Sequence, residues 1–368
     1  MPLETDITPP PASITQSPVT GNGRMGQVKG VRIAATGSYV PDKIVTNEDM
    51  AALGCDSEWI IRRTGIRARR HAAPEQATSD LCYQAAKNCL ESGGIPASDI
   101  DLVIVATITP DHPTPSTASQ LQARLGINAP AMDMGVACSG FTYALVTAAQ
   151  FVGTGNCKNV LVVGGDLMSR TVDPEDKKIS PLFGDAAGAV VLTSCDDDQA
   201  DDENGQEKAS NQDQPNGILA YQMGSTGAGA ELLCIPAGGS RQSLTPDAHA
   251  AGQHFMSMDG RNVFKWAVRA IDESITAVLD HANIQANDLS LMILHQANQR
   301  IIDSAVSDLN IDSDKVFVNL DQYGNTSAAS IPLALDEAVR GGRLQRGDLL
   351  LMSGFGAGLA WGTVLLRW

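Results

Sequence analysis

Three side chains of this sequence could carry out chemistry together: a cysteine in the middle of the chain, and a histidine and an asparagine towards its end. Cys138 follows an apolar run over 131–134, which predicts a buried strand, and precedes an apolar segment over about 139–152, which predicts a buried helix. Free N–H groups and the positive dipole at a helix start favour a thiolate, which is a nucleophile. Most free cysteines are only buried small residues, so the role of Cys138 depends on partners elsewhere.

His295 and Asn325 are the candidate partners. His295 ends an apolar strand predicted over 289–294, and Asn325 follows Gly324 between a strand-like apolar run and a helix, which repeats the layout around Cys138. The alternatives are a hydrogen-bonded core histidine and an ordinary asparagine N-cap. The glycine-rich run 353–358 predicts a flexible turn whose N–H groups could hold an oxyanion, because too few residues follow it for a dinucleotide-binding unit.

The elements that must position these residues repeat along the chain. The segments 97–105 and 286–294 share the pattern Ala-x-Asp-[Ile/Leu]-x-Leu-apolar-Ile-apolar, and similar echoes pair 159–165 with 348–354 and 187–192 with 361–366. Strands alternate with helices in both copies, which favours mixed, mainly parallel sheets. We therefore predict a tandem duplicated α/β unit with halves at 28–195 and 218–368, whose loops converge on one site.

Composition limits the class of protein. The 368 residues are 43% hydrophobic and include 35 glycines, which is typical of a globular α/β protein. Seven cysteines without a Cys-x-x-Cys pair argue for reduced thiols in a cytoplasm, and against disulfides or a zinc site. The net charge of −16 disfavours nucleic acid and anionic membranes as partners. No apolar run approaches the roughly 20 residues of a membrane span, and no secretory signal pattern opens the chain.

Two segments fall outside the repeated unit. Residues 1–27 are rich in proline, threonine and serine, which predicts a disordered N-terminal tail. Residues 196–217 carry eight acidic residues and one lysine without apolar periodicity, which predicts a solvated surface insertion. A docking role for this acidic insertion is the alternative.

The order of the motifs resembles that of the β-ketoacyl-acyl-carrier-protein synthase III family, which has the thiolase fold. The resemblance rests on Ala-Cys138-Ser-Gly-Phe, His295-Gln-Ala-Asn298, Gly-Asn325-Thr-Ser-Ala and Gly-Phe-Gly-Ala-Gly358, and on the segments 57–66, 183–188 and 335–338. It covers about 30–195 and 218–368. It implies a layered α-β-α-β-α arrangement, a cytoplasmic homodimer and an acyltransferase of fatty acid biosynthesis that needs no cofactor or metal.

The resemblance also implies a mechanism. Cys138 would take the acyl group of an acyl-CoA primer and release CoA. Malonyl-acyl carrier protein would then lose CO2, with His295 and Asn325 as N–H donors to its thioester oxygen, and attack the acyl-cysteine. The backbone N–H groups of Cys138 and Ala357 would hold the second oxyanion. The family often has glycine at the position of Ala357, so the backbone there must suit an alanine.

The remaining site residues are implied by the same resemblance. Family positions around CoA match Trp59, Arg63, Arg170, Asn298 and Gly260, although exposed arginines and a surface tryptophan are the plain alternative. A residue from the partner subunit floors the acyl pocket in the family. The matching position is Thr114, whose small side chain predicts room for a longer or branched acyl group.

A basic patch could dock the acidic carrier protein. Arg261, Lys265 and Arg269 recur every four residues and span about 80° of a predicted helix, and Arg300 could extend the patch. Two further basic positions of the family are Ser307 and Asp308 here, which weakens this prediction. A merely solubilising stripe is the alternative.

Three other functions remain open from the sequence. A related condensing enzyme or acyltransferase of specialised metabolism would use malonyl-CoA or another acceptor. A binding scaffold would leave Cys138 inert, and a cysteine hydrolase would use His295 as a base towards water. The sequence alone leaves open the primer length and the pathway.

Overall fold

The computed structural model describes residues 21, 23–195 and 217–368. The predicted tail up to residue 20, with residue 22, and the acidic insertion 196–216 lie outside the described residues. Within the described part, no helix is long and apolar enough to cross a membrane.

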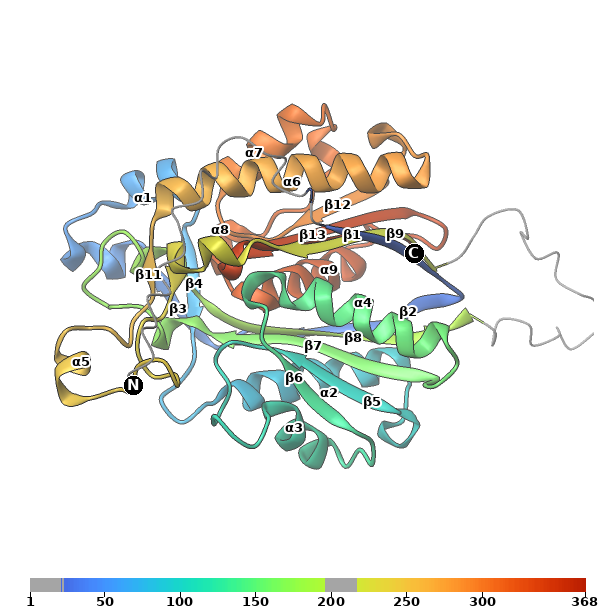
Figure 1. Ribbon diagram of the computed structural model, residues 1–368, viewed down its shortest axis with the longest axis horizontal. Coiled ribbons are helices and arrows are strands. Elements are labelled where there is room, and N and C mark those ends of the chain that lie inside the picture. The colour runs from blue at the N-terminus through green and yellow to red at the C-terminus, as the bar shows by residue number, and fades with distance from the viewer. Residues whose placement is uncertain (1–20, 22, 196–216) are drawn as a thin grey trace, which may run out of the picture.

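The chain folds into five layers, with two sheets separated by a pair of central helices and covered by helices on their outer faces (Figure 1). The first sheet has the order β2 (Val31–Tyr39), β8 (Asp185–Ser194), β7 (Asn159–Leu167), β5 (Leu102–Ala106), β6 (Ala131–Met134). The second has the order β1 (Arg24–Lys29), β9 (Gly217–Ser225), β14 (Ala360–Arg367), β13 (Leu349–Gly356), β12 (Leu291–Leu294). The predicted α-β-α-β-α layering is confirmed.

The helices fill the three remaining layers. The central pair is α4 (Gly140–Gly153) and α9 (Ser330–Arg340). The outer pairs are α2 (Thr78–Gly93) with α3 (Thr117–Leu125), and α6 (Gly260–Ala282) with α7 (Gln299–Asp308). The shorter elements are β3 (Lys43–Thr46), α1 (Ser57–Thr64), β4 (Ala68–His71), β10 (Leu233–Cys234), α5 (Pro246–Ala250), β11 (Ser257–Met258) and α8 (Leu320–Tyr323).

The two sheets have matching strand orders, since β2-β8-β7-β5 corresponds to β9-β14-β13-β12. The prediction of mainly parallel sheets is wrong, because only the pairs β5–β6, β5–β7 and β12–β13 are parallel. The connections from β7 to β8 and from β13 to β14 contain no α-helix that crosses the sheet, so each second strand returns antiparallel. The predicted strand after residue 315 is reduced to one bridge between Met292 and Val316.

The predicted boundary of the N-terminal tail is wrong at residues 24–27. These residues form the edge strand β1, which pairs antiparallel with β9 of the second half. Val28 is buried in the core, and Met25 packs against a second apolar cluster, so burial and the strand ladder together hold this segment. The N-terminal end of the chain therefore completes the sheet of the opposite half.

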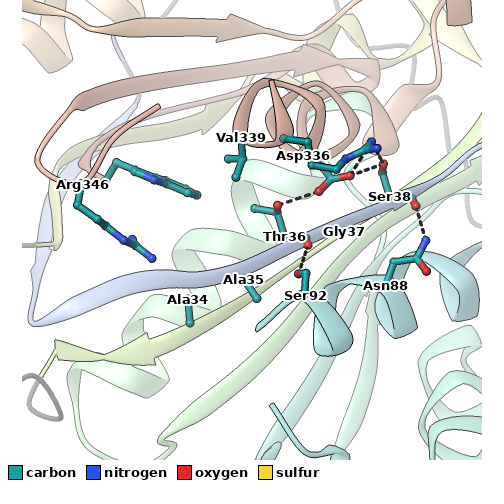
Figure 2. A pocket seen from close by; sticks show the side chains of 12 residues that line it. Ala34, Ala35, Thr36, Gly37, Ser38, Asn88, Ser92, Asp336, Val339 and Arg346 are labelled. Carbon is teal, nitrogen blue, oxygen red and sulfur yellow. Dashed lines mark hydrogen bonds and ion pairs between the residues drawn. The ribbon is translucent and has the colours of Figure 1, made fainter. Parts of the chain in front are cut away.

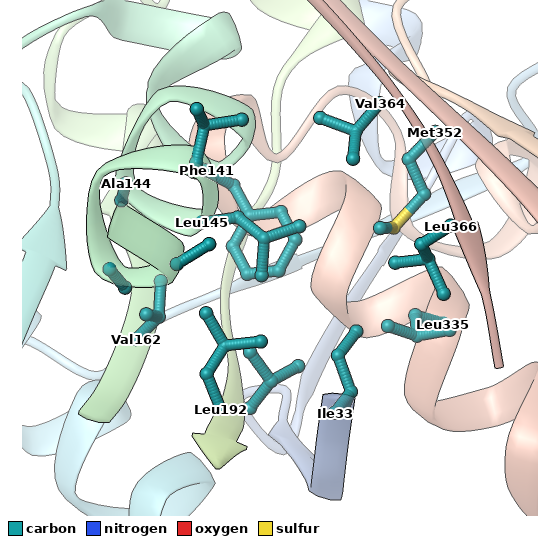
Figure 3. Packing of buried hydrophobic residues seen from close by; sticks show 14 of the residues in the cluster. Ile33, Phe141, Ala144, Leu145, Val162, Leu192, Leu335, Met352, Val364 and Leu366 are labelled. Carbon is teal, nitrogen blue, oxygen red and sulfur yellow. The ribbon is translucent and has the colours of Figure 1, made fainter. Parts of the chain in front are cut away.

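The central core lies where both sheets meet α4 and α9. Figure 3 shows Phe141 and Leu145 of α4 among Val162 and Leu192 of one sheet and Met352 of the other. Glycines let the second half approach the first sheet: a Cβ on Gly164 would lie 2.2 Å from the carbonyl oxygen of Ala328, and one on Gly188 would lie 2.6 Å from the nitrogen of Leu333.

A buried carboxylate on α9 also joins the halves. Asp336 accepts hydrogen bonds from the hydroxyls of Thr36 (2.8 Å) and Ser38 (2.6 Å) on β2, and pairs with Arg340 at 3.0 Å. Figure 2 shows Asp336 reaching from its helix towards Thr36 and Ser38, beside a pocket that Arg346 also lines. None of these residues lines the cavity that contains Cys138.

Candidate active site

One cavity between the halves brings together six of the predicted site residues, including the three predicted catalytic side chains. Its wall includes Cys138, His295, Asn325, Ala357, Asn298 and Gly260. The rest of the lining is mostly apolar and includes Ile108, Met168, Phe183, Met256, Met258 and Phe355. We call this space the catalytic cavity. Its apolar walls suit an acyl chain, and its few polar groups are the ones that the sequence indicated.

Cys138 lies in a 3₁₀ turn (η3, Ala137–Ser139) that leads directly into α4. Ala137 has a left-handed backbone with φ 46°, which turns the chain sharply from β6 towards the helix. Gly356 of β13 lies close by, because a Cβ there would come within 2.9 Å of the Cβ of Cys138. Cys138, the candidate nucleophile, therefore lies so close to β13 that position 356 needs a glycine.

The expectation of a thiolate at this helix start is wrong. Burial raises the pKa of the Cys138 thiol to about 12, although a hydroxyl interaction with Ser327 and the turn's own backbone oppose the shift. Cys138 is 7% exposed, so water cannot solvate a charge on its sulfur. Desolvation outweighs the helix dipole here, and Cys138 is a neutral thiol at pH 7.

His295 is neutral for the same reason. Its ring is buried, and burial lowers the pKa of His295 to about 3. Its Nδ1 lies 2.6 Å from the hydroxyl of Ser330, the first residue of α9, and the edge of its ring meets Phe355. The Ser330 oxygen also accepts from the N–H of Gln296 at 3.4 Å. In the tautomer in which Ser330 donates to Nδ1, the ring proton lies on Nε2, and Nε2–H is then a neutral donor.

The sequence predicted that Asn325 stands at the start of a helix, and this prediction is wrong. Helix α8 ends at Tyr323, and a 3₁₀ turn (η10, Ser327–Ala329) separates Asn325 from α9. The side-chain Oδ1 of Asn325 accepts from the N–H of Ser327 at 2.9 Å, and its backbone N–H donates to Leu182 at 2.8 Å. Because Oδ1 is used in this way, the Nδ2 end of the amide is the one left to donate.

The glycine-rich run near the C-terminus is mostly strand, so the prediction of a flexible turn over 353–358 is wrong. Strand β13 extends to Gly356, and only Ala357–Leu359 turn back into β14. Ala357 has no left-handed backbone, whereas Gly358 (φ 76°) and Leu359 (φ 46°) do. The conformation at residue 357 is therefore one that alanine adopts without strain, as the sequence required.

The predicted CoA residues divide into two groups. Gly260 and Asn298 line the catalytic cavity, and the Nδ2 of Asn298 donates to the carbonyl of Arg63 at 3.1 Å, which ties α1 to the His295 loop. The guanidinium of Arg63 stacks over the ring of Trp59 at 4.6 Å.

Two further predicted residues lie outside the cavity wall. The guanidinium of Arg170 donates to the carbonyls of Ala73, Pro74 and Gln76, so within one chain it braces the loop before α2. Thr114 is exposed on the segment between β5 and α3 and does not line the cavity of its own chain.

The basic patch predicted for docking lies on α6 and α7. Arg261, Lys265 and Arg300 are exposed, and Arg269 pairs with Glu273 at 3.4 Å. Lys265 and Arg269 line a groove between the two helices, together with Asn262, Phe264, Trp266, Val268 and Ser304. Phe264 also lines the catalytic cavity, and Arg300 lies over its ring at 5.5 Å. The patch therefore borders the cavity through a shared aromatic side chain.

Two side chains that contact His295 were not predicted from the sequence. Ser330 hydrogen-bonds its Nδ1, and Phe355 packs against its ring. The small-residue run after Asn325 was the only local signal for Ser330, because the contact joins positions 35 residues apart. Among the described residues, no group of three His, Cys, Asp or Glu side chains could hold a metal ion.

Comparisons with known proteins identify the family of the chain. A family model described as 3-oxoacyl-[acyl-carrier-protein (ACP)] synthase III matches residues 132–206, and the model of its C-terminal part matches residues 279–368. A β-ketoacyl-[acyl-carrier-protein] synthase III of Rhodopirellula baltica is 67% identical over 94% of this chain and 100% of its own. One from Desulfitobacterium hafniense is 46% identical over 92% and 98%. The crystal structure of a synthase III from Aquifex aeolicus superposes with a TM-score of 0.80 at 42% identity, covering 92% and 100%.

A duplicated, layered α/β fold with a buried cysteine in the cavity between its halves defines a thiolase-like condensing enzyme. The chain belongs to the β-ketoacyl-acyl-carrier-protein synthase III family. The resemblance of its motifs to that family is confirmed.

The pKa of Cys138 predicts how the protein reacts with iodoacetamide. Because the thiol titrates near pH 12, the rate of its alkylation should rise about tenfold per pH unit from pH 7 to 9.5, without levelling off. Mass spectrometry of the peptide that contains Cys138 measures this rate, and Cys138→Ser shows the background from the other cysteines. A plateau reached below pH 8.5 would mean that the helix start does favour the thiolate.

Proposed function

We propose that this chain is a β-ketoacyl-ACP synthase III, which condenses an acyl-CoA primer with malonyl-acyl carrier protein through an acyl group on Cys138. The observation that carries the proposal is the electrostatics of the cavity. A buried thiol shares it with two neutral N–H donors, Nε2 of His295 and Nδ2 of Asn325. Neutral donors stabilise a developing oxyanion without holding a charge in the resting site.

The first half-reaction is acyl transfer. The sulfur of Cys138 attacks the thioester carbon, the carbon–sulfur bond to CoA breaks, and the thiol proton leaves with the departing CoA sulfur. The high pKa of Cys138 means that this proton moves only as the thioester arrives. The backbone N–H groups of Cys138 and Ala357 are the proposed donors to the tetrahedral oxyanion, supported by the close approach of Gly356 to Cys138.

The second half-reaction is decarboxylative condensation. The electron pair of the carbon–carboxylate bond moves onto the malonyl thioester as CO2 leaves, and the charge gathers on the thioester oxygen. His295 and Asn325 donate to this oxygen, and the α-carbon then attacks the acyl-cysteine carbonyl. The carbon–sulfur bond to Cys138 then breaks and 3-oxoacyl-ACP leaves. The Cys138 thiolate takes up one proton from solvent and returns as a thiol. These steps make the enzyme an acyltransferase that initiates fatty acid synthesis and, as proposed, uses no cofactor.

The substrate contacts follow from the placement of the remaining residues. Trp59 and Arg63 do not line the cavity, but they stack on each other and Arg63 accepts a hydrogen bond from the cavity residue Asn298. They are proposed for the nucleotide of CoA, with Asn298 and Gly260 along the pantetheine. Arg170 is proposed to contribute only indirectly, because its guanidinium holds the loop before α2 in place. Thr114, exposed in one chain, is proposed to reach the acyl pocket of a partner subunit in a cytoplasmic homodimer.

The groove between α6 and α7 is the proposed docking surface for the carrier protein. It combines the cations of Lys265 and Arg269 with apolar walls from Phe264 and Val268, which fits a helix that carries acidic and apolar side chains. Arg261 and Arg300 add positive charge beside the groove, and Arg300 lies over Phe264, which also lines the catalytic cavity. The positive charge of this patch attracts an acidic partner locally, although the whole chain has a net charge of −16.

The choice of acceptor tests the proposed function. With an acyl-CoA primer, the protein should release CO2 from malonyl-ACP with a kcat/KM at least about a hundredfold above that with malonyl-CoA, because docking contributes binding energy. His295→Ala should abolish condensation yet leave Cys138 able to form the acyl-enzyme, since it removes a donor used only afterwards. Equal activity with malonyl-CoA would favour a condensing enzyme of specialised metabolism.

Charge reversal tests the docking surface. Lys265→Glu should raise the KM for malonyl-ACP about tenfold and leave the KM for acyl-CoA unchanged, since the charge faces only the protein substrate. The matched control is Lys87→Glu on α2, an exposed lysine of the opposite outer layer, which should change neither value. Steady-state kinetics with each substrate varied in turn give both constants. Equal effects of the two variants would argue for a merely solubilising stripe.

A further inference from the structure

Asp166 is a fully buried carboxylate that the proposed mechanism does not use. It lies near the carboxyl end of β7 and is 0% exposed. Its Oδ1 accepts from the hydroxyls of Thr107 and Thr109 and from the N–H groups of Ile108 and Thr109, at 2.8–3.2 Å. Its Oδ2 accepts from the N–H of Ala328 at 3.2 Å.

A group of this kind is costly to bury. No ion pair in the described part of the chain involves Asp166, so neutral donors alone stabilise it, and burial raises the pKa of Asp166. Its charge also adds to the effect of burial in raising the pKa of Cys138. A carboxylate that opposes ionisation of the nucleophile needs a compensating role.

The five hydrogen bonds show what Asp166 connects. One oxygen holds the loop after β5, which belongs to the first half and supplies Ile108 to the catalytic cavity. The other oxygen holds Ala328, which belongs to η10 in the second half. Asp166 therefore links the loop that supplies Ile108 to the cavity with η10, the turn that follows the cavity residue Asn325.

The turn η10 is the segment on which both proposed donors depend. It follows Asn325, whose amide is oriented by the N–H of Ser327, and it precedes Ser330, which orients His295. Ser327 has a left-handed backbone (φ 51°), which the surrounding contacts must maintain. Its buried hydroxyl lies near both Cys138 and Asp166 but makes no hydrogen bond of normal geometry in the described structure.

We propose that Asp166 is a positioning residue for the condensation step. By anchoring Ala328, its Oδ2 holds η10 so that Nδ2 of Asn325 and Nε2 of His295 converge on one oxygen of the malonyl thioester. This inference rests on the proposed function. In this role Asp166 neither contacts the substrate nor transfers a proton. The role affects the two half-reactions differently, because acyl transfer needs only Cys138, whereas condensation also needs η10 to be held in place.

Asp166→Asn tests the inference because it removes the hydrogen bond from the N–H of Ala328 to Oδ2 of Asp166. If the amide oxygen stays with the four donors of the β5 loop, the NH2 group faces the N–H of Ala328, so the link to η10 is lost. The kcat of condensation should fall about tenfold to a hundredfold, as expected for donors displaced by a fraction of an ångström. The rate of acyl-Cys138 formation should stay within about threefold, and the KM for malonyl-ACP within about twofold.

Asp336→Asn is the matched control. Asp336 is also a buried aspartate that links the halves, but it binds β2 and lies outside the catalytic cavity. This variant should lower thermal stability and leave the ratio of condensation to acylation unchanged. The same ratio in both variants would overturn the inference, since Asp166 would then act only on stability. Failure of the unmutated protein to condense would instead overturn the proposed function.

Thr107→Val decides the question if Asp166→Asn does not fold. This nearly isosteric change removes one donor at 2.9 Å from Oδ1 and leaves the carboxylate in place. A carboxylate that can rotate holds Ala328 less well, so condensation should slow about threefold to tenfold with acylation unchanged. Unchanged condensation in this variant would contradict the inference.

Discussion

Exclusion of water from the space between the two halves is the constraint on which the rest of the site depends. The same burial keeps Cys138 protonated and His295 unprotonated, shifting their pKa values in opposite directions to about 12 and about 3. In such a cavity a resting ion pair is expensive, which favours the neutral nucleophile and neutral donors that we propose. Charge appears only with the substrate, where N–H groups already in place can stabilise it.

The duplication explains how one cavity contains both the proposed nucleophile and the proposed oxyanion donors. Each half has a 3₁₀ turn before a central helix, η3 before α4 and η10 before α9, and each turn begins with a left-handed residue, Ala137 or Ser327. One turn carries Cys138, the proposed nucleophile, and the other lies between Asn325 and Ser330, next to the proposed donors. Glycines at 164 and 188 let the second half approach the first sheet, while Asp166 and Asp336 bridge the halves with hydrogen bonds. The active site is thus an interface within one chain.

Apolar runs and glycine junctions are local signals, and they predicted the matching halves and a shared site for Cys138, His295 and Asn325, whereas the layers were implied by the resemblance to the family. It did not predict that β1 joins the sheet of the other half, or that β8 and β14 return antiparallel, since strand pairing is decided by distant partners. The thiolate expectation failed because a helix start is visible in sequence, whereas desolvation depends on what covers the thiol. Ser330 and Asp166 were missed for the same reason, as their partners lie in remote segments.

The central claim is that Cys138 carries the acyl group. The most direct test is the intact mass of the protein after incubation with acyl-CoAs from acetyl to dodecanoyl, beside Cys138→Ala. We predict a stable gain of one acyl group, absent from the variant, with the best-loading chain length reporting the depth of the acyl pocket. Loading that persists in Cys138→Ala, or no loading from any acyl-CoA or carrier-bound donor, would contradict the account.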